Sequence, residues 1–247
     1  MKASLVIPAY NEARRIEACV RGVAEWSRAR PGGIDWEILL VDDGSTDDTA
    51  SLARRYAAEE GLDLKVLGYE RNRGKGAAIR VGVLASKGDP VLISDTDLST
   101  PLLEWTKLAE RLPAHTVAIG SRALQQELVR KRQAFYRVWL GRAGNSVIQL
   151  FAVPGIEDTQ CGFKLFQGDA ARALFSEAKV DRFAWDVEIL YLARRSGLAI
   201  AEVPVIWINS PESKVRFVRD AVQTLWDVLR IRWLHRNDQA ARGSSPA

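Results

Sequence analysis

Residues 36–46 read WEILLVDDGST, an apolar run that ends abruptly in acidic and small side chains. Such a run is typical of a parallel strand that is buried on both faces. Thr46 or Asp47 can cap the helix that follows, and Gly61 can end it. The stretch therefore predicts a strand, a loop and a helix in succession, with polar residues at the carboxyl end of the strand.

The same kind of apolar run recurs along the first half of the chain, at residues 3–8, 64–69, 90–94 and 116–120. Strands that alternate with helices indicate an α/β fold with a Rossmann-like, mostly parallel sheet flanked by helices. Ligands of such sheets bind in the crevice beyond the carboxyl ends of the strands. We therefore look for functional residues directly after each apolar run.

The bulk composition is that of a soluble globular protein, with 47% hydrophobic and 27% charged residues among 247. We expect one folded domain at residues 1–212, a basic amphipathic helix at 213–236 and a disordered tail at 237–247. The first residues lack the pattern of a signal peptide, which predicts a cytoplasmic protein. The two cysteines are far apart and indicate neither a disulfide framework nor a zinc site. A net charge of +4 is too small to indicate a nucleic-acid partner, and we expect none.

The most informative polar residues are Asp95 and Asp97, which follow the apolar run at residues 90–93. Residues i and i+2 of a strand point to the same face, so both carboxylates can project together. Hard divalent ions such as Mg²⁺ and Mn²⁺ take oxygen ligands and share them with substrate phosphates. The pair predicts such a site, although it could instead cap a helix that starts near Pro101.

Two further segments suit a nucleotide. Tyr10 offers a flat face for stacking, and the turn at residues 42–45 can accept hydrogen bonds from a base or ribose. The loop RNRGKG at residues 71–76, which includes Lys75 and Gly76, can bring N–H groups and cations to a diphosphate. It has neither P-loop nor dinucleotide-binding spacing. Plain turn chemistry is the alternative interpretation of these segments.

Taken in order, these motifs resemble those of the inverting family 2 glycosyltransferases with the GT-A fold. The resemblance is carried by IPAYNE (7–12), VDDGSTD (41–47), NRGKG (72–76) and DTD (95–97). A second set is most similar to dolichyl-phosphate β-glucosyltransferases within that family. It comprises GSR (120–122), DTQCGFKLF (158–166), DVEIL (186–190), EVPVIW (202–207) and SK (213–214). Together the two sets cover roughly residues 1 to 215.

The resemblance implies roles for individual residues. The uridine would be surrounded by Pro8, Tyr10, Glu12 and Asp43. Asp97 would ligate Mg²⁺ or Mn²⁺ directly, and Asp95 would contact the ribose or the metal shell. The donor diphosphate and the acceptor phosphate would be held by Arg122, Arg132 and Lys214. Asp158 is a candidate for an additional catalytic carboxylate, and equally it could only fix its loop.

The implied reaction moves glucose from UDP-glucose onto a polyprenyl or dolichyl phosphate at the cytoplasmic face of a membrane. The basic, aromatic stretch at residues 130–139 and the helix at 213–236, with Trp226 and Trp233 among arginines, could lie peripherally on that surface. Alternatively, both segments pack on the sheet. Other possibilities are a GDP-mannose donor, a soluble or glycan acceptor, and a non-catalytic nucleotide-binding recruitment module. A membrane-protein partner or a homo-oligomer is also compatible with the sequence.

Overall fold

The structure is a computed structural model that describes residues 2–29, 31–130, 148–149, 152–208 and 217–236. Its strands are β1 (Lys2–Ala9), β2 (Asp35–Asp42), β3 (Leu64–Gly68), β4 (Val91–Ile93), β5 (Val117–Ser121), β6 (Val129–Arg130), β7 (Lys164–Phe166), β8 (Ile200–Pro204) and β9 (Trp207–Ile208). Its α-helices are α1 (Ile16–Arg28), α2 (Thr49–Glu60), α3 (Lys75–Ala85), α4 (Trp105–Ala109), α6 (Gly168–Glu177), α7 (Trp185–Arg195) and α8 (Phe217–Leu234). Short 3-10 helices are η1 (Pro31–Gly33), η2 (Leu102–Glu104) and η3 (Gln126–Leu128).

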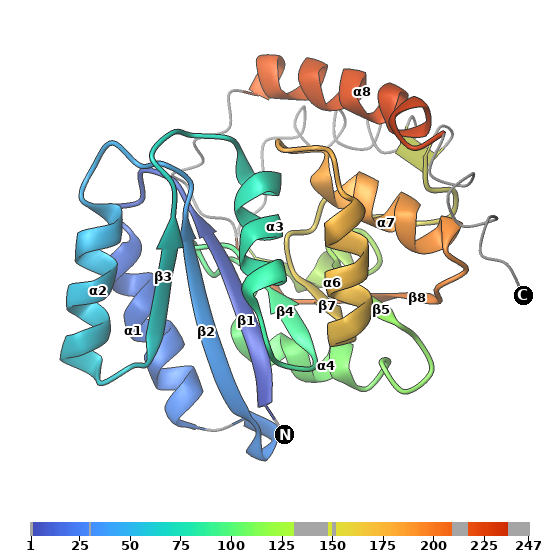
Figure 1. Ribbon diagram of the computed structural model, residues 1–247. Helices are drawn as coiled ribbons and strands as arrows, with labels where there is room; N and C mark the ends of the chain where they lie inside the picture. Colours follow the sequence, from blue (N-terminus) through green and yellow to red (C-terminus); the bar gives the residue numbers. More distant parts are fainter. Residues whose placement is uncertain (1, 30, 131–147, 150–151, 209–216, 237–247) are drawn as a thin grey trace, which may run out of the picture.

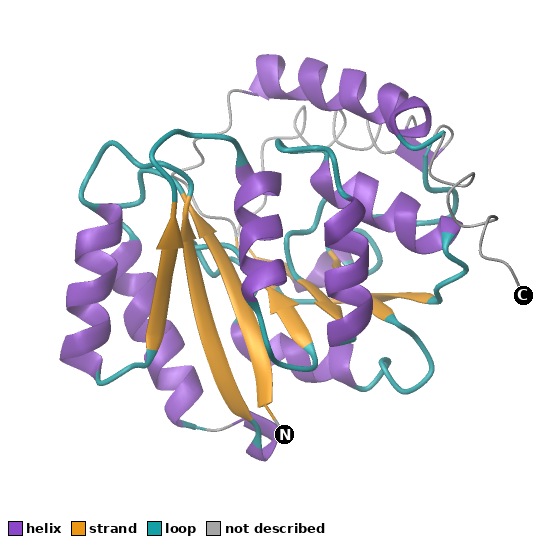
Figure 2. Ribbon diagram, in the orientation of Figure 1, coloured by secondary structure: helices purple, strands orange, loops and turns teal. Residues whose placement is uncertain are grey.

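The main sheet has the strand order β3-β2-β1-β4-β7-β5-β8, and a separate small sheet pairs β6 with β9 (Figure 2). Every neighbouring pair in the main sheet is parallel except those made by β7, which runs antiparallel to both β4 and β5. Lys164, the first residue of β7, lies opposite Ile93 and Ile119. The start of β7 therefore lies at the edge where β4 and β5 end.

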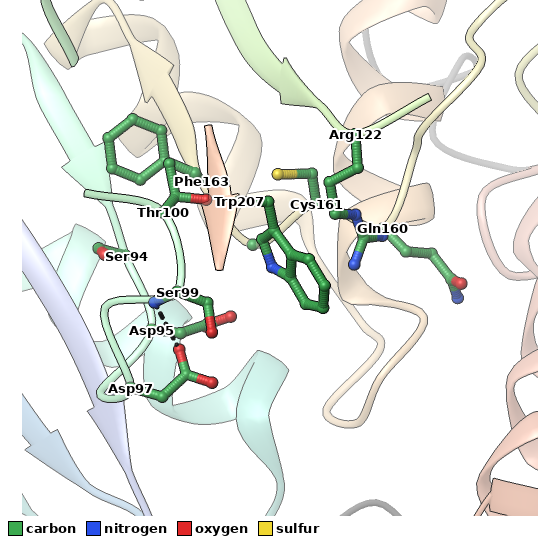
Figure 3. A pocket seen from close by; sticks show the side chains of 11 residues that line it. Ser94, Asp95, Asp97, Ser99, Thr100, Arg122, Gln160, Cys161, Phe163 and Trp207 are labelled. Carbon is green, nitrogen blue, oxygen red and sulfur yellow. Dashed lines mark hydrogen bonds between the residues drawn. The ribbon is translucent and has the colours of Figure 1, made fainter. Parts of the chain in front are cut away.

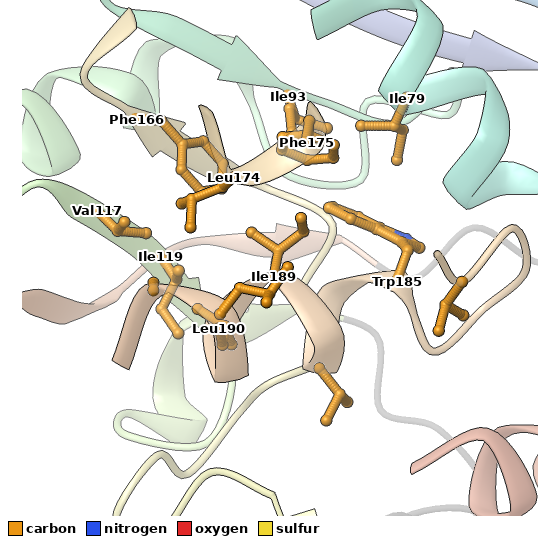
Figure 4. Close-up of a cluster of buried hydrophobic side chains, with 14 of the residues drawn as sticks. Ile79, Ile93, Val117, Ile119, Phe166, Leu174, Phe175, Trp185, Ile189 and Leu190 are labelled. Atoms are coloured by element: carbon orange, nitrogen blue, oxygen red, sulfur yellow. The ribbon is translucent and has the colours of Figure 1, made fainter. Parts of the chain in front are cut away.

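Helices cover both faces of the sheet, which gives three layers (Figure 1). One face packs its buried side chains against α3, α6, α7 and α8, and Figure 4 shows part of this cluster around Phe166, Phe175 and Trp185. The other face packs against α1, α2 and α4. The strands of the main sheet supply side chains to both clusters, as Leu39 and Leu40 of β2 do. This arrangement confirms the predicted α/β fold.

Two segments differ from or go beyond the sequence-based expectation. The sequence of residues 198–208 predicts a single strand, but the structure divides it into β8 and β9. The ladder with β5 ends at Pro204, which lies opposite Ser121, the last residue of β5, and Ile208 pairs instead with Arg130 of β6. Within the C-terminal segment predicted as a helix at 213–236, the structure describes α8 at Phe217–Leu234, whereas residues 209–216 and the predicted tail at 237–247 lie outside the described residues. None of the described helices is both long enough and apolar enough to cross a membrane.

Candidate functional site

The acidic pair, Asp95 and Asp97, lies directly after β4 at the carboxyl edge of the sheet. Asp95 Oδ1 is 2.6 Å from the ammonium nitrogen of Lys75, the first residue of α3. Burial alone would raise the pKa of Asp95, but the cation of Lys75, helped by Lys164 and Arg122, holds it below its ordinary value. Asp95 is therefore an anion with a fixed counter-charge.

Both carboxylates are held by the loops around them. The backbone of Gly162, which precedes β7, lies so close to Asp95 that an added Cβ would be 2.4 Å from Asp95 Oδ2. Glycine is thus required where this loop meets the carboxylate. Asp97 Oδ1 accepts a hydrogen bond of 3.0 Å from the N–H of Ser99 (Figure 3). The acidic pair is positioned by a strand end on one side and by the loop into β7 on the other.

A pocket opens beside the acidic pair (Figure 3). Its lining residues come from the ends of β4, β5 and β9 and from the loop before β7: Ser94, Asp95, Asp97, Ser99, Thr100, Arg122, Gln160, Cys161, Gly162, Phe163 and Trp207. The view shows the indole of Trp207 between the acidic pair and Arg122. The guanidinium of Arg122 is 5.7 Å from the centre of the Trp207 ring. The pocket therefore has an anionic side and a cationic side.

The donors of this pocket fit a Mg²⁺ or Mn²⁺ ion that shares its ligands with a substrate. Asp95 and Asp97 supply carboxylate oxygens, the ligand type that these ions prefer. Among the described residues, no three His, Cys, Asp or Glu side chains form a preassembled metal cluster. An ion at the acidic pair would thus need phosphate or water oxygens to complete its coordination, as is usual for Mg²⁺.

Arg122 and Asp158 form a bidentate pair. Arg122 Nε donates to Asp158 Oδ2 over 2.7 Å and Nη2 donates to Oδ1 over 2.8 Å, while the Arg122 N–H also donates to Oδ2. Burial would raise the pKa of Asp158, but Arg122 lowers it below the ordinary value. Glu202 of β8 accepts the N–H groups of Glu157 and Asp158. These contacts favour the loop-fixing role of Asp158 over a role as proton acceptor, and they aim Arg122 at the pocket.

The ends of β1 and β2 bring the predicted nucleotide-binding residues together. Pro8 is buried within β1, and Tyr10, directly after the strand, exposes 39% of its surface. Asn11 adopts a φ of 54° and accepts the N–H of Thr46, which ties this loop to the turn after β2. The carboxylate of Glu12 pairs with Arg15 at 2.7 Å.

Asp43 organises the loop before α3. It is 2% exposed, and its oxygens accept hydrogen bonds from Tyr69, the Asn72 side chain and the N–H groups of Arg73 and Gly74. Because so many donors meet this carboxylate inside the protein, its described contacts are with the loop at residues 69–74. A direct contact of Asp43 with uridine stays a prediction.

Gly76 packs tightly in the first turn of α3. An added Cβ would be 2.5 Å from the carbonyl oxygen of Val180 and 2.7 Å from Trp185 Cβ. Gly74, which precedes the helix, meets the carbonyl of Asp181 equally closely, and the Ala77 N–H donates to that same carbonyl over 3.0 Å. The segment before α7 therefore fixes the turn that carries Lys75.

Two buried charges near the site carried no individual role in the sequence-based prediction. Lys164 is 0% exposed, and its ammonium donates to the carbonyls of Thr159 and Cys161 in the loop that lines the pocket. Burial lowers its pKa, against the opposing charge of Asp186. Burial likewise raises the pKa of Asp186 to about 6, against the nearby cations of Lys164 and Lys75. The sequence signal that could have identified Lys164 is its position inside the apolar run FKLF at residues 163–166.

The structure thus brings Asp95, Asp97, Arg122 and Lys75 to one edge of the sheet. Pro8, Tyr10, Glu12, Asp43 and Gly76 lie at or beside the neighbouring strand ends. Arg132 and Lys214 lie outside the described residues, as does most of the basic stretch at 130–139. Their predicted contacts with phosphate stay predictions.

Comparison of the sequence with known proteins finds a family model and relatives that cover most of the chain. Residues 4–175 match the sequence model described as Glycosyl transferase family 2. The chain is 38% identical to the dolichyl-phosphate beta-glucosyltransferase of Drosophila melanogaster over 228 residues, which span 87% of this chain and 69% of that protein. It is 37% identical to the enzyme of the same name from Homo sapiens over 224 residues, with 86% and 69% covered.

Solved structures share the fold at lower sequence identity. Glucosyl-3-phosphoglycerate synthase of Mycobacterium tuberculosis, in a complex with Mn²⁺, UDP and glucosyl-3-phosphoglycerate, superposes with a TM-score of 0.67 at 20% identity, covering 94% of this chain and 79% of that one. Mannosyl-3-phosphoglycerate synthase of Rubrobacter xylanophilus gives a TM-score of 0.68 at 19% identity, with 100% and 77% covered. These solved structures therefore share the fold of this chain.

Proposed function

The chain belongs to glycosyl transferase family 2, and we propose that it transfers glucose from UDP-glucose to a polyprenyl or dolichyl phosphate with inversion at the anomeric carbon. The observation that carries this proposal is a single pocket with the acidic pair on one side and Arg122 on the other. The first side suits a metal-bound donor diphosphate, and the second suits an anionic acceptor. Relatives named dolichyl-phosphate beta-glucosyltransferase, similar over most of the chain, support the choice of sugar and acceptor.

On the donor side, Asp95 and Asp97 would hold Mg²⁺ or Mn²⁺, and Lys75 would lie beside the diphosphate. The bound ion would neutralise the negative charge that develops on the leaving UDP. A solved neighbour of the same fold contains Mn²⁺ and UDP, which supports this arrangement. Tyr10 and the loops after β1 and β2 would receive the nucleoside, with Pro8, Glu12, Asp43 and Gly76 shaping that region.

On the acceptor side, Arg122 would hold the phosphate of the lipid. Asp158 accepts hydrogen bonds from Nε and Nη2 of Arg122 and so fixes the direction of the guanidinium. The remaining N–H groups of Arg122 can donate to a phosphate oxygen. That oxygen attacks the anomeric carbon while the bond to the UDP oxygen breaks and UDP leaves with the electron pair. Because a phosphate monoester is already ionised near neutral pH, the attack needs little help from a general base.

A lipid-linked acceptor requires an enzyme that works at a membrane surface. We further propose that this surface is the cytoplasmic face of the membrane. Arg132 and Lys214 remain candidates for additional phosphate contacts.

The decisive experiment incubates the purified protein and Mn²⁺ with a polyprenyl phosphate and either UDP-[¹⁴C]glucose or GDP-[¹⁴C]mannose. We expect label in the organic extract from UDP-glucose only, and we expect EDTA to abolish it. Label in the organic extract from GDP-mannose alone would show that UDP-glucose is not the donor. If the protein consumes UDP-glucose but all of the label stays in water-soluble products, the proposal of a lipid acceptor would be wrong.

A further inference from the structure

Helix α8 carries an exposed apolar stripe. Trp226, Leu229 and Trp233 expose 61%, 47% and 57% of their surfaces. Their spacing of three and four residues places them on one side of the helix, and we call them the α8 stripe. Three such large apolar side chains together on one helix face are unusual for a surface that meets only water.

The opposite side of α8 is already packed against the protein. Val228 and Ile231 are buried in the cluster that α7 also joins. Just beyond the helix, buried His235 lies with its Nε2 2.7 Å from Glu188 Oε1 of α7. Lys179 Nζ donates to the carbonyl of Leu234 over 2.9 Å. These contacts fix the rotation of α8 about its axis, so the stripe is a second apolar face that the protein's own core does not cover.

Positive charge accompanies the stripe. Arg230, Arg232 and Arg236 are exposed, and the guanidinium of Arg236 lies 5.0 Å from the centre of the Trp233 ring. Within residues 226–236, the part of this segment whose side chains the structure describes, the one acidic residue is Asp227, which is partly buried. Two copies of this face would bring arginines together, which disfavours a symmetric dimer. Tryptophan and arginine together suit the headgroup region of an anionic bilayer.

The position of α8 fits such a contact. Figure 1 shows α8 at the end of the molecule toward which the arrows of β1, β2 and β3 point. The acidic pair of the pocket follows β4, which runs parallel to β1, and therefore lies at the same end. The preceding strand, β9, contributes Trp207 to the pocket. A bilayer that contacts α8 would therefore lie at the same end of the molecule as the acidic pair and Arg122.

We propose that the α8 stripe, with Arg230, Arg232 and Arg236, is the surface through which this protein binds an anionic lipid bilayer. This inference rests on the proposed function for its biological setting, since a lipid acceptor brings the enzyme to a membrane. The apolar side chains of the α8 stripe enter the boundary between headgroups and acyl chains, and the three arginines contact lipid phosphates. Substrate plays no part in this contact.

Vesicle flotation without substrates tests the surface directly. The wild-type protein should float with vesicles of phosphatidylcholine and phosphatidylglycerol, and much less with phosphatidylcholine alone. The W226A/W233A variant and the R230Q/R232Q variant should each bind the anionic vesicles about tenfold more weakly. Matched controls are Leu103→Ala, an exposed leucine of η2, and Arg54→Gln on α2, both of which should bind as the wild type does.

Brominated acyl chains add a test of orientation. They should quench part of the wild-type tryptophan fluorescence, and this part should be missing in W226F/W233F. Variants that bind vesicles as well as the wild type would overturn the proposal. The proposal would also be overturned if the wild-type protein did not bind vesicles and formed a dimer that was absent in W226A/W233A. The α8 stripe would then be a protein–protein interface.

A separate assay distinguishes this inference from the proposed function. With a short-chain polyprenyl phosphate dispersed in detergent, the stripe variants should transfer glucose at the wild-type rate, because none of the substituted residues lines the pocket. Normal vesicle binding without any glucosyl transfer would refute the proposed reaction and leave the docking surface standing. Normal transfer with unaltered vesicle binding by the variants would refute the docking surface alone.

Discussion

Lys75 and Asp95 form an ion pair with 2.6 Å between Lys75 Nζ and Asp95 Oδ1, joining the first turn of α3 to the loop after β4. Burial would lower the pKa of Lys75, but Asp95 raises it above the ordinary value, so both groups are charged. One of the two carboxylates proposed to lie near a metal is thus already neutralised by a side chain. A metal ion bound at the acidic pair, as proposed, would share Asp95 with Lys75 or compete with it.

Lys75→Met should therefore change metal and nucleotide affinity in opposite directions. Removal of the ammonium strengthens Mn²⁺ binding, because Asp95 loses its competing partner, and weakens UDP binding, because a cation beside the diphosphate is lost. We expect about tenfold in each direction, equivalent to roughly 1.4 kcal/mol. Isothermal titration calorimetry measures both affinities, with Lys65→Met as the control ion-pair variant. A parallel loss of both affinities would mean that Lys75 holds Asp95 in place rather than competing with metal.

Asp97→Asn should nearly abolish turnover without unfolding the protein. The amide keeps the shape of the side chain but loses the charge that a divalent ion needs. Loss of one well-placed electrostatic stabiliser costs about 3 to 4 kcal/mol, or a factor of about 100 to 1,000 in kcat. Asp169→Asn, at a fully exposed carboxylate of α6, is the matched control. Near-normal turnover of the Asp97 variant, with Mn²⁺ still required, would remove Asp97 from the metal site.

Asp158→Asn separates a positioning role from a catalytic one. If Asp158 orients Arg122, the variant raises the KM for the lipid phosphate and loses about 2 kcal/mol of folding stability, while the shape of the pH profile stays unchanged. If Asp158 accepts a proton in the reaction, the acidic limb of the profile disappears instead. Initial rates across pH and a thermal melt distinguish the two. A double variant, R122M/D158L, should recover stability but not activity, because it leaves no buried charge unpaired.

Glu37 gives a prediction about stability and pH. It is 4% exposed; burial would raise its pKa, but Lys65, the Lys87 N–H and the Ser4 hydroxyl together lower it to about 2, from an ordinary 4.5. A lowered pKa means that the charged form stabilises the folded state above pH 4.5. This contribution is lost as the pH falls toward 2.

Glu37→Gln should accordingly lower the free energy of unfolding by about 2 kcal/mol at pH 7. Urea unfolding at a series of pH values checks this, and the gap between variant and wild type should narrow below pH 4.5. A gap that stays constant down to pH 3.5 would assign the stabilisation to the shape of the side chain rather than to its charge.

Much of the fold follows from local sequence signals. The runs that form β1, β2 and β4 are apolar because parallel strands are covered by helices on both faces, and the acidic pair follows a strand end. The insertion of β7 between β4 and β5 could not be predicted in this way. β7 has three residues, one of them Lys164, and its antiparallel pairing depends on contacts far apart in the sequence.

Local sequence patterns also did not predict which way individual side chains point. The turn at residues 42–45 predicts polar groups near a ligand, but it does not reveal that the Asp43 carboxylate turns toward the loop at residues 69–74. Helix α8 presents a similar problem, because it has two apolar faces. Spacing alone groups Trp226, Leu229 and Trp233, whereas only packing shows that Val228 and Ile231 form the covered face.

The reversed direction of β7 also bears on how this enzyme could diversify. The chain leaves the sheet after Ser121 of β5 and returns at Lys164 of β7, and both points lie on the same edge. The intervening sequence is thus an excursion that begins and ends beside the pocket. Its exchange or lengthening leaves the strand order of the main sheet and the donor-side loops after β1, β2 and β4 in place, although it replaces β6 and thus the small sheet with β9. Chimeras with exchanged residues 123–157 would therefore keep Arg122 and Asp158 as well as the donor-side loops, and would vary the chain that joins the two strand ends beside the pocket.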